Sequence, residues 1–253
     1  FYRSLKMKPC KNNGYSFFDR KGKGDITKFL EVFLREYKKT KNKGYISFVS
    51  GNHDIPRVSI GRNKKDLEVI YAFLMTMPGV PFIYYGDEIG MKYLDLPSKE
   101  GGYHRTGSRT PMQWNESKNK GFSKASANEL YLPVDTNKNA PCVENQKDKS
   151  NSLMNKLRKL IELRKSHKAL GNNGNFEVLY AKKDKYPFIY MRKSGNERFM
   201  IIINPSDKTQ KAKFQYQGST KPELVCGSEA NLKIAGKNVV ISAATVTYSI
   251  YKI

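Results

Sequence analysis

Residues able to do acid–base or ligand-binding chemistry cluster in two short segments, each directly after an apolar run. His53 and Asp54 end the first segment, and Asp87 and Glu88 follow the apolar run 80–85. A carboxylate after a strand either stabilises positive charge that develops on a substrate or closes an Asx-type turn. It also commonly binds a helix N-terminus or a neighbouring arginine. The residue types alone do not decide whether the two segments take part in catalysis or only support the structure.

A second group of polar and aromatic candidates lies in the loop-rich stretch 89–149. His104, Arg105 and Arg109 belong to it, and a guanidinium there either grips a ligand hydroxyl or pins the loop. Trp114 follows, and its ring either stacks on a ligand or fills the core. A loop of this length inside a compact domain is usually functional, so the stretch is expected to border a binding site.

An alternation of strand and helix positions the two carboxylate segments. Apolar residues at helical spacing predict helices over 25–40, with Asp25 as N-cap, and over 66–77. Short β-rich runs at 45–49 and 80–85 predict strands. Strand, helix, strand is the order of a parallel α/β sheet, in which chemistry takes place beyond the C-terminal ends of the strands. Both segments are therefore expected at one edge of one sheet.

The spacing of hydrophobic residues along the chain changes near Gly171. Helical spacing begins at Leu153 and stops at that glycine, and short β-rich runs follow it. These runs, separated by turn residues, are 176–181, 188–192, 199–204, 223–226, 239–241 and 245–251. The pattern predicts a small antiparallel β-domain. We therefore divide the chain into residues 1–170 and residues 171–253.

The composition is that of a folded protein with a strongly basic charge. The 253 residues are 38% hydrophobic and carry 46 Lys and Arg against 23 Asp and Glu, a net charge of +23. Most of the cations are lysines scattered along the chain, whereas a dedicated nucleic-acid binder more often clusters them on one element. No stretch approaches the roughly 20 apolar residues that span a bilayer. We therefore expect neither nucleic acid nor membrane as a partner.

The cysteines and the start of the chain carry little functional signal. Cys10, Cys142 and Cys226 have neither metal-ligand spacing nor an even number, so we expect no metal, no cofactor and no disulfide framework in this segment. The stretch 1–24 is polar and is predicted to be mostly loop. It shows neither an initiator Met nor a signal region, which predicts a piece of a longer protein, with a cytoplasmic location as the default expectation.

Three motifs, taken together, carry a family resemblance. They are FVSGNHDIPR (48–57), GVPFIYYGDEIG (79–90) and SRTPMQW (108–114). The first two look like the segments around the seventh and eighth barrel strands of glycoside hydrolase family 13, the α-amylase family. The third is similar to a signature of its oligo-α-glucosidase and trehalose synthase branches. The order of the motifs also agrees with that family, which ends in a small β-domain.

The resemblance implies a fold and a reaction. It implies a (β/α)8 barrel and a retaining mechanism with an Asp nucleophile, a Glu acid–base and a third carboxylate that favours the oxocarbenium-like sugar ring. Asp54 matches that third carboxylate, His53 its hydroxyl-binding neighbour, and Arg109 a residue near the glucose-binding subsite. Asp87 and Glu88 are expected to be supports. The implied substrates are α-1,4 or α-1,6 glucosides of starch- or maltose-derived glucans and oligosaccharides.

One departure from the family pattern changes the prediction. In the family, the nucleophile and the acid both precede the segment that matches Asn52. No strand-end motif before Asn52 resembles either of them here. The nearest carboxylates are Asp19, which lies in a loop, and Asp25, which lies at a helix start. We therefore expect α/β architecture, the C-terminal part of a TIM barrel (about strands 7 and 8 with helices) followed by a small antiparallel β-sandwich. The segment by itself is expected to be inactive, and any calcium would belong to the missing part.

Other functions remain open on the sequence. A trehalose synthase or another transglycosylase would share the three motifs. A non-catalytic scaffold relative is a different class of protein, and the pair His53 and Asp54 weighs against it because a scaffold needs no transition-state anion. A basic nucleic-acid-binding protein is the remaining alternative.

Overall fold

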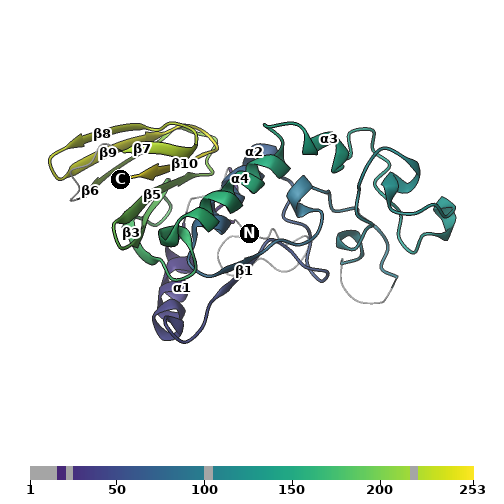
Figure 1. The fold of residues 1–253 in the computed structure, drawn as a ribbon, viewed down its shortest axis with the longest axis horizontal. Coiled ribbons are helices and arrows are strands. Elements are labelled where there is room, and N and C mark those ends of the chain that lie inside the picture. The colour runs from purple at the N-terminus through teal and green to yellow at the C-terminus, as the bar shows by residue number, and fades with distance from the viewer. Residues whose placement is uncertain (1–15, 21–24, 100–104, 217–221) are drawn as a thin grey trace.

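The computed structural model describes residues 16–20, 25–99, 105–216 and 222–253. Two antiparallel sheets lie at one end, helices occupy the middle, and a loop-rich segment extends at the other end (Figure 1). Most of the predicted N-terminal loop (1–24) lies outside the described residues, as do His104 and Cys10.

A strand–helix–strand unit forms the part of the chain that carries the carboxylate segments. Strands β1 (Ser47–Val49) and β2 (Val80–Phe82) pair in parallel, with Phe48 opposite Pro81. Between them in sequence runs helix α2 (Lys64–Thr76), two residues longer at its start than its hydrophobic spacing predicts. The parallel arrangement confirms the α/β prediction for this part of the chain.

Local capping explains where the first two helices begin. At α2, Asn63 and Asp66 form a reciprocal capping box, with the Asn63 N–H donating to Asp66 Oδ2 at 2.7 Å. Helix α1 spans Thr27–Thr40, and Asp25 Oδ1 accepts the N–H of Thr27 at 2.8 Å. Asp25 therefore binds the first turn, although Ile26 occupies the residue position directly before the helix.

Short helical elements follow β2, and a third long helix packs on α2. The long helix is α4 (Leu153–Ser166), and the short elements are η1 (Asp87–Ile89), η2 (Thr106–Ser108), η3 (Lys118–Gly121), η4 (Ala127–Glu129), α3 (Glu144–Lys147) and η5 (Lys168–Leu170). The stretch predicted to be loop-rich therefore contains only single turns of helix in its described part.

The C-terminal region consists of two antiparallel sheets. Their strands are β3 (Asn175–Tyr180), β4 (Phe188–Ser194), β5 (Glu197–Asn204), β6 (Gln210–Gln215), β7 (Glu223–Gly227), β8 (Asn231–Ala235), β9 (Asn238–Ala243) and β10 (Thr247–Lys252). One sheet has the order β3-β4-β5-β10-β7 and the other β6-β9-β8. The sequence did not predict β6 and β8, which are edge strands rich in exposed polar residues.

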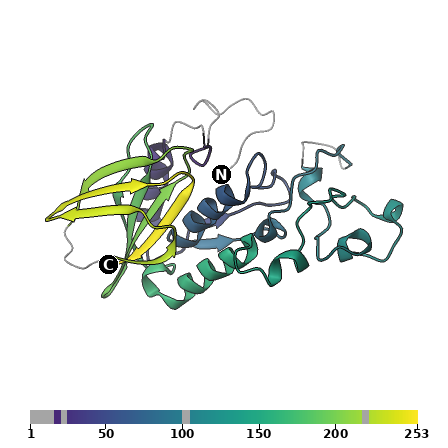
Figure 2. The ribbon, with the colours of Figure 1, turned by 90° about the horizontal axis from the view of Figure 1, so that it is seen from above.

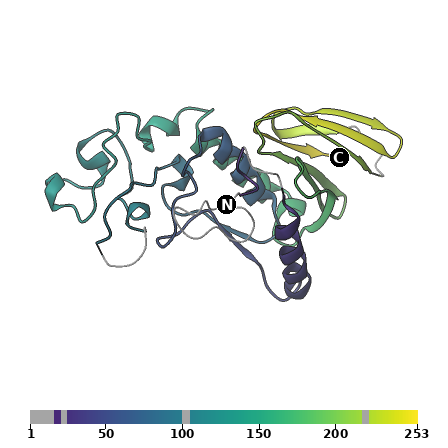
Figure 3. The ribbon, with the colours of Figure 1, turned by 180° about the vertical axis from the view of Figure 1, so that it is seen from behind.

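The five-stranded sheet is buried on both faces. In β4, Phe188 and Tyr190 join the hydrophobic cluster of the helices, whereas Ile189 and Met191 join a second cluster shared with the three-stranded sheet. Successive side chains of a strand point to opposite faces, so this strand contacts both layers. Figures 2 and 3 show the sheet between the helices and the smaller sheet. The predicted division between residues 170 and 171 falls between η5 and β3. The hydrophobic cluster of the helices contains residues on both sides of that division.

Arg192 of the five-stranded sheet, which is buried, and Arg164 of α4, which is partly buried, both bind the C-terminal end of α2. Arg192 of β4 has no exposed surface, and its guanidinium donates to the carbonyl of Thr76 and, at 2.6 Å, to that of Gly171. Arg164 of α4 donates to the Met75 carbonyl at 2.6 Å. Burial lowers the pKa of Arg192 to about 9 and that of Arg164 to about 10, so both stay charged at neutral pH. Two cations thus satisfy the last carbonyls of the helix, where its dipole favours positive charge.

We expect Arg192→Met to destabilise the protein by about 3 kcal/mol, because it leaves several buried carbonyls without donors. Urea denaturation followed by circular dichroism measures the change. The matched control is Arg158→Met, which removes an exposed arginine of α4 and should cost no more than about 0.5 kcal/mol. Equal costs for the two variants would contradict the role of Arg192.

Candidate active site

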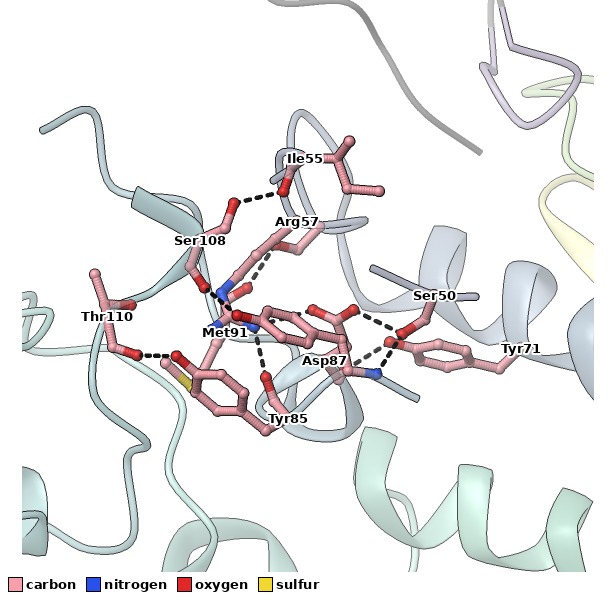
Figure 4. A network of polar contacts seen from close by, with 11 residues as sticks. Ser50, Ile55, Arg57, Tyr71, Tyr85, Asp87, Met91, Ser108 and Thr110 are labelled. Carbon is pink, nitrogen blue, oxygen red and sulfur yellow. Dashed lines mark hydrogen bonds and ion pairs between the residues drawn. The ribbon is translucent and has the colours of Figure 1, made fainter. Parts of the chain in front are cut away.

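The two predicted carboxylate segments meet beyond the C-terminal ends of β1 and β2. Ser50, the residue after β1, joins them: its hydroxyl donates to Asp87 Oδ2 at 2.7 Å and accepts the N–H of Tyr84 at 2.9 Å. Asp87 approaches so closely that a Cβ on Gly51 would lie 2.7 Å from Oδ2. Any side chain at position 51 would therefore displace the Asp87 carboxylate, whose bond to Ser50 is drawn in Figure 4.

Asp54 lies at the centre of a group of basic side chains. Its Oδ1 atom accepts hydrogen bonds from Arg105 Nη1 at 3.0 Å and Arg109 Nη2 at 3.1 Å. Its Oδ2 atom lies 3.1 Å from Nε2 of His53. The Asp54 N–H donates to Asn52 Oδ1 at 2.8 Å, which holds the turn. The structure thus brings together the three residues that the resemblance assigned to the site, and Arg105 with them.

The surroundings of Asp54 keep its carboxylate ionised. Partial desolvation raises its pKa, but the electrostatic interaction with His53 and the hydrogen bonds from Arg105 and Arg109 outweigh that effect, so the pKa lies below the ordinary value of 3.8. The side chain remains 50% exposed. Asp54 is therefore an anion, accessible to a ligand, that does not serve as a proton donor near neutral pH.

The segment 108–114 runs across the strand ends and positions Arg109. The Ser108 hydroxyl donates to the Ile55 carbonyl at 2.6 Å, and the Tyr85 hydroxyl donates to the Thr110 carbonyl at 2.8 Å (Figure 4). Arg109 itself donates from Nε to the His53 carbonyl at 2.9 Å. Arg109 therefore both pins the loop and faces the candidate site, so the two functions that the sequence left open are combined.

Asp87 is a buried support. It has no exposed surface, and its Oδ1 atom pairs with Arg57 Nη1 at 3.1 Å. Burial raises the pKa of Asp87, although Arg57 and the Ser50 hydroxyl partly offset the shift. The Arg57 guanidinium lies 5.1 Å from the Tyr84 ring centroid and 5.0 Å from that of Tyr85, which are cation–π distances. The buried pair of Asp87 and Arg57 therefore supports the exposed residues of the candidate site from below.

Glu88 and Trp114 border a cavity next to Arg109. The cavity has a volume of about 440 Å³. Burial raises the pKa of Glu88, and its Oε2 atom is buried without a hydrogen-bond partner among the described residues. Trp114 is 49% exposed, so its ring is not part of the core.

Sequence reasoning missed the residues that hold the site together. Arg57, Ser50 and Tyr85 all lie inside the quoted motifs, but their residue types alone did not indicate that they contact Asp87 or the loop 108–114. Among the described residues there is no cluster of three or more metal-ligating side chains. Within the same residues, no helix combines the length and the apolar character needed to cross a bilayer.

We expect Arg57→Met to destabilise the protein by about 3–5 kcal/mol, because it leaves the Asp87 carboxylate buried without its partner. The additional substitution Asp87→Asn should restore part of that loss, so the double-mutant cycle in urea denaturation should show coupling. The matched control is Arg105→Met, whose pair with Asp54 is exposed and should cost about 1 kcal/mol or less. Additive effects of the two substitutions would show that the buried ion pair is not formed.

Comparison with known proteins identifies the chain's relatives. Residues 10–173 match the model of the α-amylase catalytic domain. Oligo-1,6-glucosidase of Parageobacillus thermoglucosidasius is 32% identical over 229 residues, covering 74% of this chain and 40% of the relative. Trehalose synthase of Thermus thermophilus is 32% identical over 172 residues, covering 65% and 17%. The chain thus spans less than half the length of these relatives.

The fold has matches among solved structures as well. Isomaltulose synthase from Erwinia rhapontici NX5 superimposes with a TM-score of 0.73 at 20% identity, covering 90% of this chain and 46% of that one. At this identity the structural similarity supports the fold alone, whereas the match to the family model supports membership of the family. On the family model and on the motifs that surround Asp54, the chain belongs to the α-amylase family of glycoside hydrolases and related transglycosylases.

Proposed function

We propose that this chain supplies the seventh and eighth strands of a (β/α)8 barrel and the transition-state-stabilising carboxylate of a retaining enzyme that acts on α-glucosidic bonds. The two antiparallel sheets would form the β-sandwich that follows the barrel. One observation carries the proposal: Asp54 is an exposed anion, held by His53, Arg105 and Arg109 beyond the C-terminal ends of two parallel strands. That edge of a barrel is where such enzymes carry out their chemistry.

Asp54 fits the electrostatic demand of the reaction. Positive charge develops at the anomeric carbon as the glycosidic bond breaks. A fixed anion close to that carbon binds the transition state more tightly than the ground state, which lowers the barrier. The lowered pKa of Asp54 keeps the charge in place, and the two guanidinium groups fix its position.

His53 and Arg109 are the proposed hydroxyl-binding groups. The His53 side chain is 64% exposed and pairs with Asp54, so its ring can also reach a bound sugar. Arg109 donates from Nε to the His53 carbonyl and from Nη2 to Asp54, so its guanidinium is fixed beside the anion. Both residues would thus orient a glucose unit relative to the anion.

The proposed substrates are α-1,4- or α-1,6-linked glucans and oligosaccharides. The oligo-1,6-glucosidase match and the 31% identical glucan 1,6-alpha-glucosidase of Streptococcus pneumoniae support hydrolysis. The trehalose synthase match supports a transglycosylase as the second candidate. A scaffold without catalysis is disfavoured, because it would need no accessible anion at the strand ends, and Asp54 stays 50% exposed despite its three basic neighbours.

We expect the 253-residue chain alone to release no p-nitrophenol from p-nitrophenyl α-glucoside. Retaining hydrolysis needs a nucleophile and an acid about 5–5.5 Å apart. The side chains in contact with Asp54 are basic and cannot form that pair. Turnover above a buffer blank that is lost in Asp54→Ala would contradict this expectation.

In a polypeptide where this chain follows the first six strands of the barrel, Asp54→Asn should lower kcat by about 100- to 1000-fold. The amide keeps the shape of the side chain but removes the charge, so KM should change much less. Steady-state kinetics on maltose and isomaltose measure both constants. Retention of more than about a tenth of the wild-type kcat would reduce Asp54 to a turn residue.

A further inference from the structure

The outer face of the three-stranded sheet β6-β9-β8 carries lysines. In β6, Lys211 and Lys213 are exposed, and Ala212 between them is buried. In β8, Lys233 is exposed, and Leu232 beside it packs against the cluster shared with the five-stranded sheet. Successive side chains of a strand point to opposite faces, so the three lysines lie on the face that turns away from the core. The five-stranded sheet covers the opposite face (Figures 2 and 3).

The strand register places these lysines close together. Lys213 pairs with Val240 of β9, and Lys233 pairs with the same valine from the other side. Neighbouring strands lie about 4.8 Å apart, so the two lysine positions are about 10 Å from each other. Lys211 lies two residues before Lys213, which is about 7 Å along the strand. The three positions therefore form one compact group of positive charge.

Two further lysines extend this group at the strand ends. Lys208 is exposed just before β6, and Lys237 is exposed in the turn between β8 and β9. None of the five lysines forms an ion pair within the described part of the chain. The stretches 208–222 and 230–253 contain neither Asp nor Glu. We call the surface of these five residues the lysine face: Lys208, Lys211, Lys213, Lys233 and Lys237.

Charge of one sign without partners does not stabilise a sheet. Like charges repel each other, so the lysine face costs stability unless an anion covers it. Lysines on edge strands such as β6 and β8 also hinder pairing with another chain. That protective effect needs only a charge or two on each edge, and it does not require a whole sheet without acidic residues. The absence of acids therefore points to an anionic partner.

The composition of the face favours a lipid surface over nucleic acid. The ammonium group of lysine is a compact point charge, whereas recognition of bases and of single strands relies on arginine and on aromatic rings. Neither arginine nor an aromatic residue is present among the outward positions of the three strands, where the remaining side chains are Gln215, Asn231, Ala235, Asn238, Val240 and Ser242. Charges spread over three strands can contact a flat surface together, whereas a nucleic-acid duplex curves away from such an array.

We propose that the lysine face binds the surface of a bilayer that contains anionic phospholipids. Groups of about four to eight basic residues are typical of such attachment, which is peripheral and needs no helix across the bilayer. Along the chain the lysines are scattered, which is why a membrane partner is not expected from the sequence, but the fold gathers five of them. The loop-rich segment that borders the candidate site extends at the other end of the molecule (Figure 1), so attachment leaves the site accessible.

Sedimentation of the full chain with vesicles tests the proposal. We expect binding to vesicles of phosphatidylcholine with about 30% phosphatidylserine, and none to phosphatidylcholine alone, at about 0.1 M salt. The combined change Lys211→Gln, Lys213→Gln and Lys233→Gln should raise the lipid concentration for half binding about 100-fold, equivalent to about 2.8 kcal/mol. Replacing the same three lysines with arginine keeps the charge and should preserve binding.

The matched control removes the same charge from the helices. Lys38→Gln, Lys159→Gln and Lys165→Gln together change three exposed lysines of α1 and α4, which are separated from the lysine face by the five-stranded sheet. The two sheets alone are about 10 Å apart, which equals the Debye length at this salt concentration, so the control should weaken binding less than about threefold. Circular dichroism verifies that each variant is folded.

Several outcomes would overturn the proposal. Equal weakening by the two glutamine variants would assign the binding to net charge in general. Equal binding to both kinds of vesicle, or to neither, would remove the anionic lipid as the partner. Tighter binding to a DNA duplex of about 20 base pairs than to the vesicles, lost in the lysine-face variant, would assign the face to nucleic acid. Aggregation of that variant with unchanged vesicle binding would show that the lysines only protect the strand edges.

Discussion

The buried pair of Arg57 and Asp87 is the interaction on which the candidate site depends. Asp87 accepts from Ser50 at the end of β1, and Arg57 donates to the carbonyl of Tyr85 after β2. The same guanidinium lies against the ring of Tyr85, whose hydroxyl holds the segment 108–114. A single ion pair thus joins both strand ends to the loop that carries Arg109. Burying it carries a desolvation cost, which hydrogen bonds to Ser50 and to the Tyr85 carbonyl offset only in part, because Arg57 Nε and Nη2 have no hydrogen-bond partner among the described residues.

The two carboxylates of the site have opposite environments and therefore different roles. Asp87 is fully buried, and burial raises its pKa, so it needs Arg57 to stay charged. Asp54 is half exposed among cations, which lower its pKa. Only Asp54 can therefore contact a substrate while its carboxylate is ionised. Such a division of roles by environment is common where one carboxylate supports and another reacts.

The five-stranded sheet shares one hydrophobic cluster with the helices and a second cluster with the three-stranded sheet. Alternate residues of β4 and β5 face the helices and the second sheet, so the five-stranded sheet connects both layers. Arg192 extends this connection by satisfying the carbonyl of Thr76 at the end of α2. Because α2 leads into β2, the geometry of the site depends on packing that originates in the C-terminal region. A boundary in sequence near Gly171 is therefore not a boundary in the hydrophobic core.

The sequence by itself determined the local elements. The helical period of 3.6 residues, the strand period of 2 residues and the turn residues all depend on positions that are close together in the chain. It predicted both parallel strands, the three long helices and the family motifs around Asp54. It missed the edge strands β6 and β8, whose exposed polar faces carry little hydrophobic signal. Only the tertiary structure decided which carboxylate is buried, since Asp87 and Asp54 both follow strands and differ in their distant neighbours. It also decided that Trp114 faces a cavity, because burial depends on residues far apart in the chain.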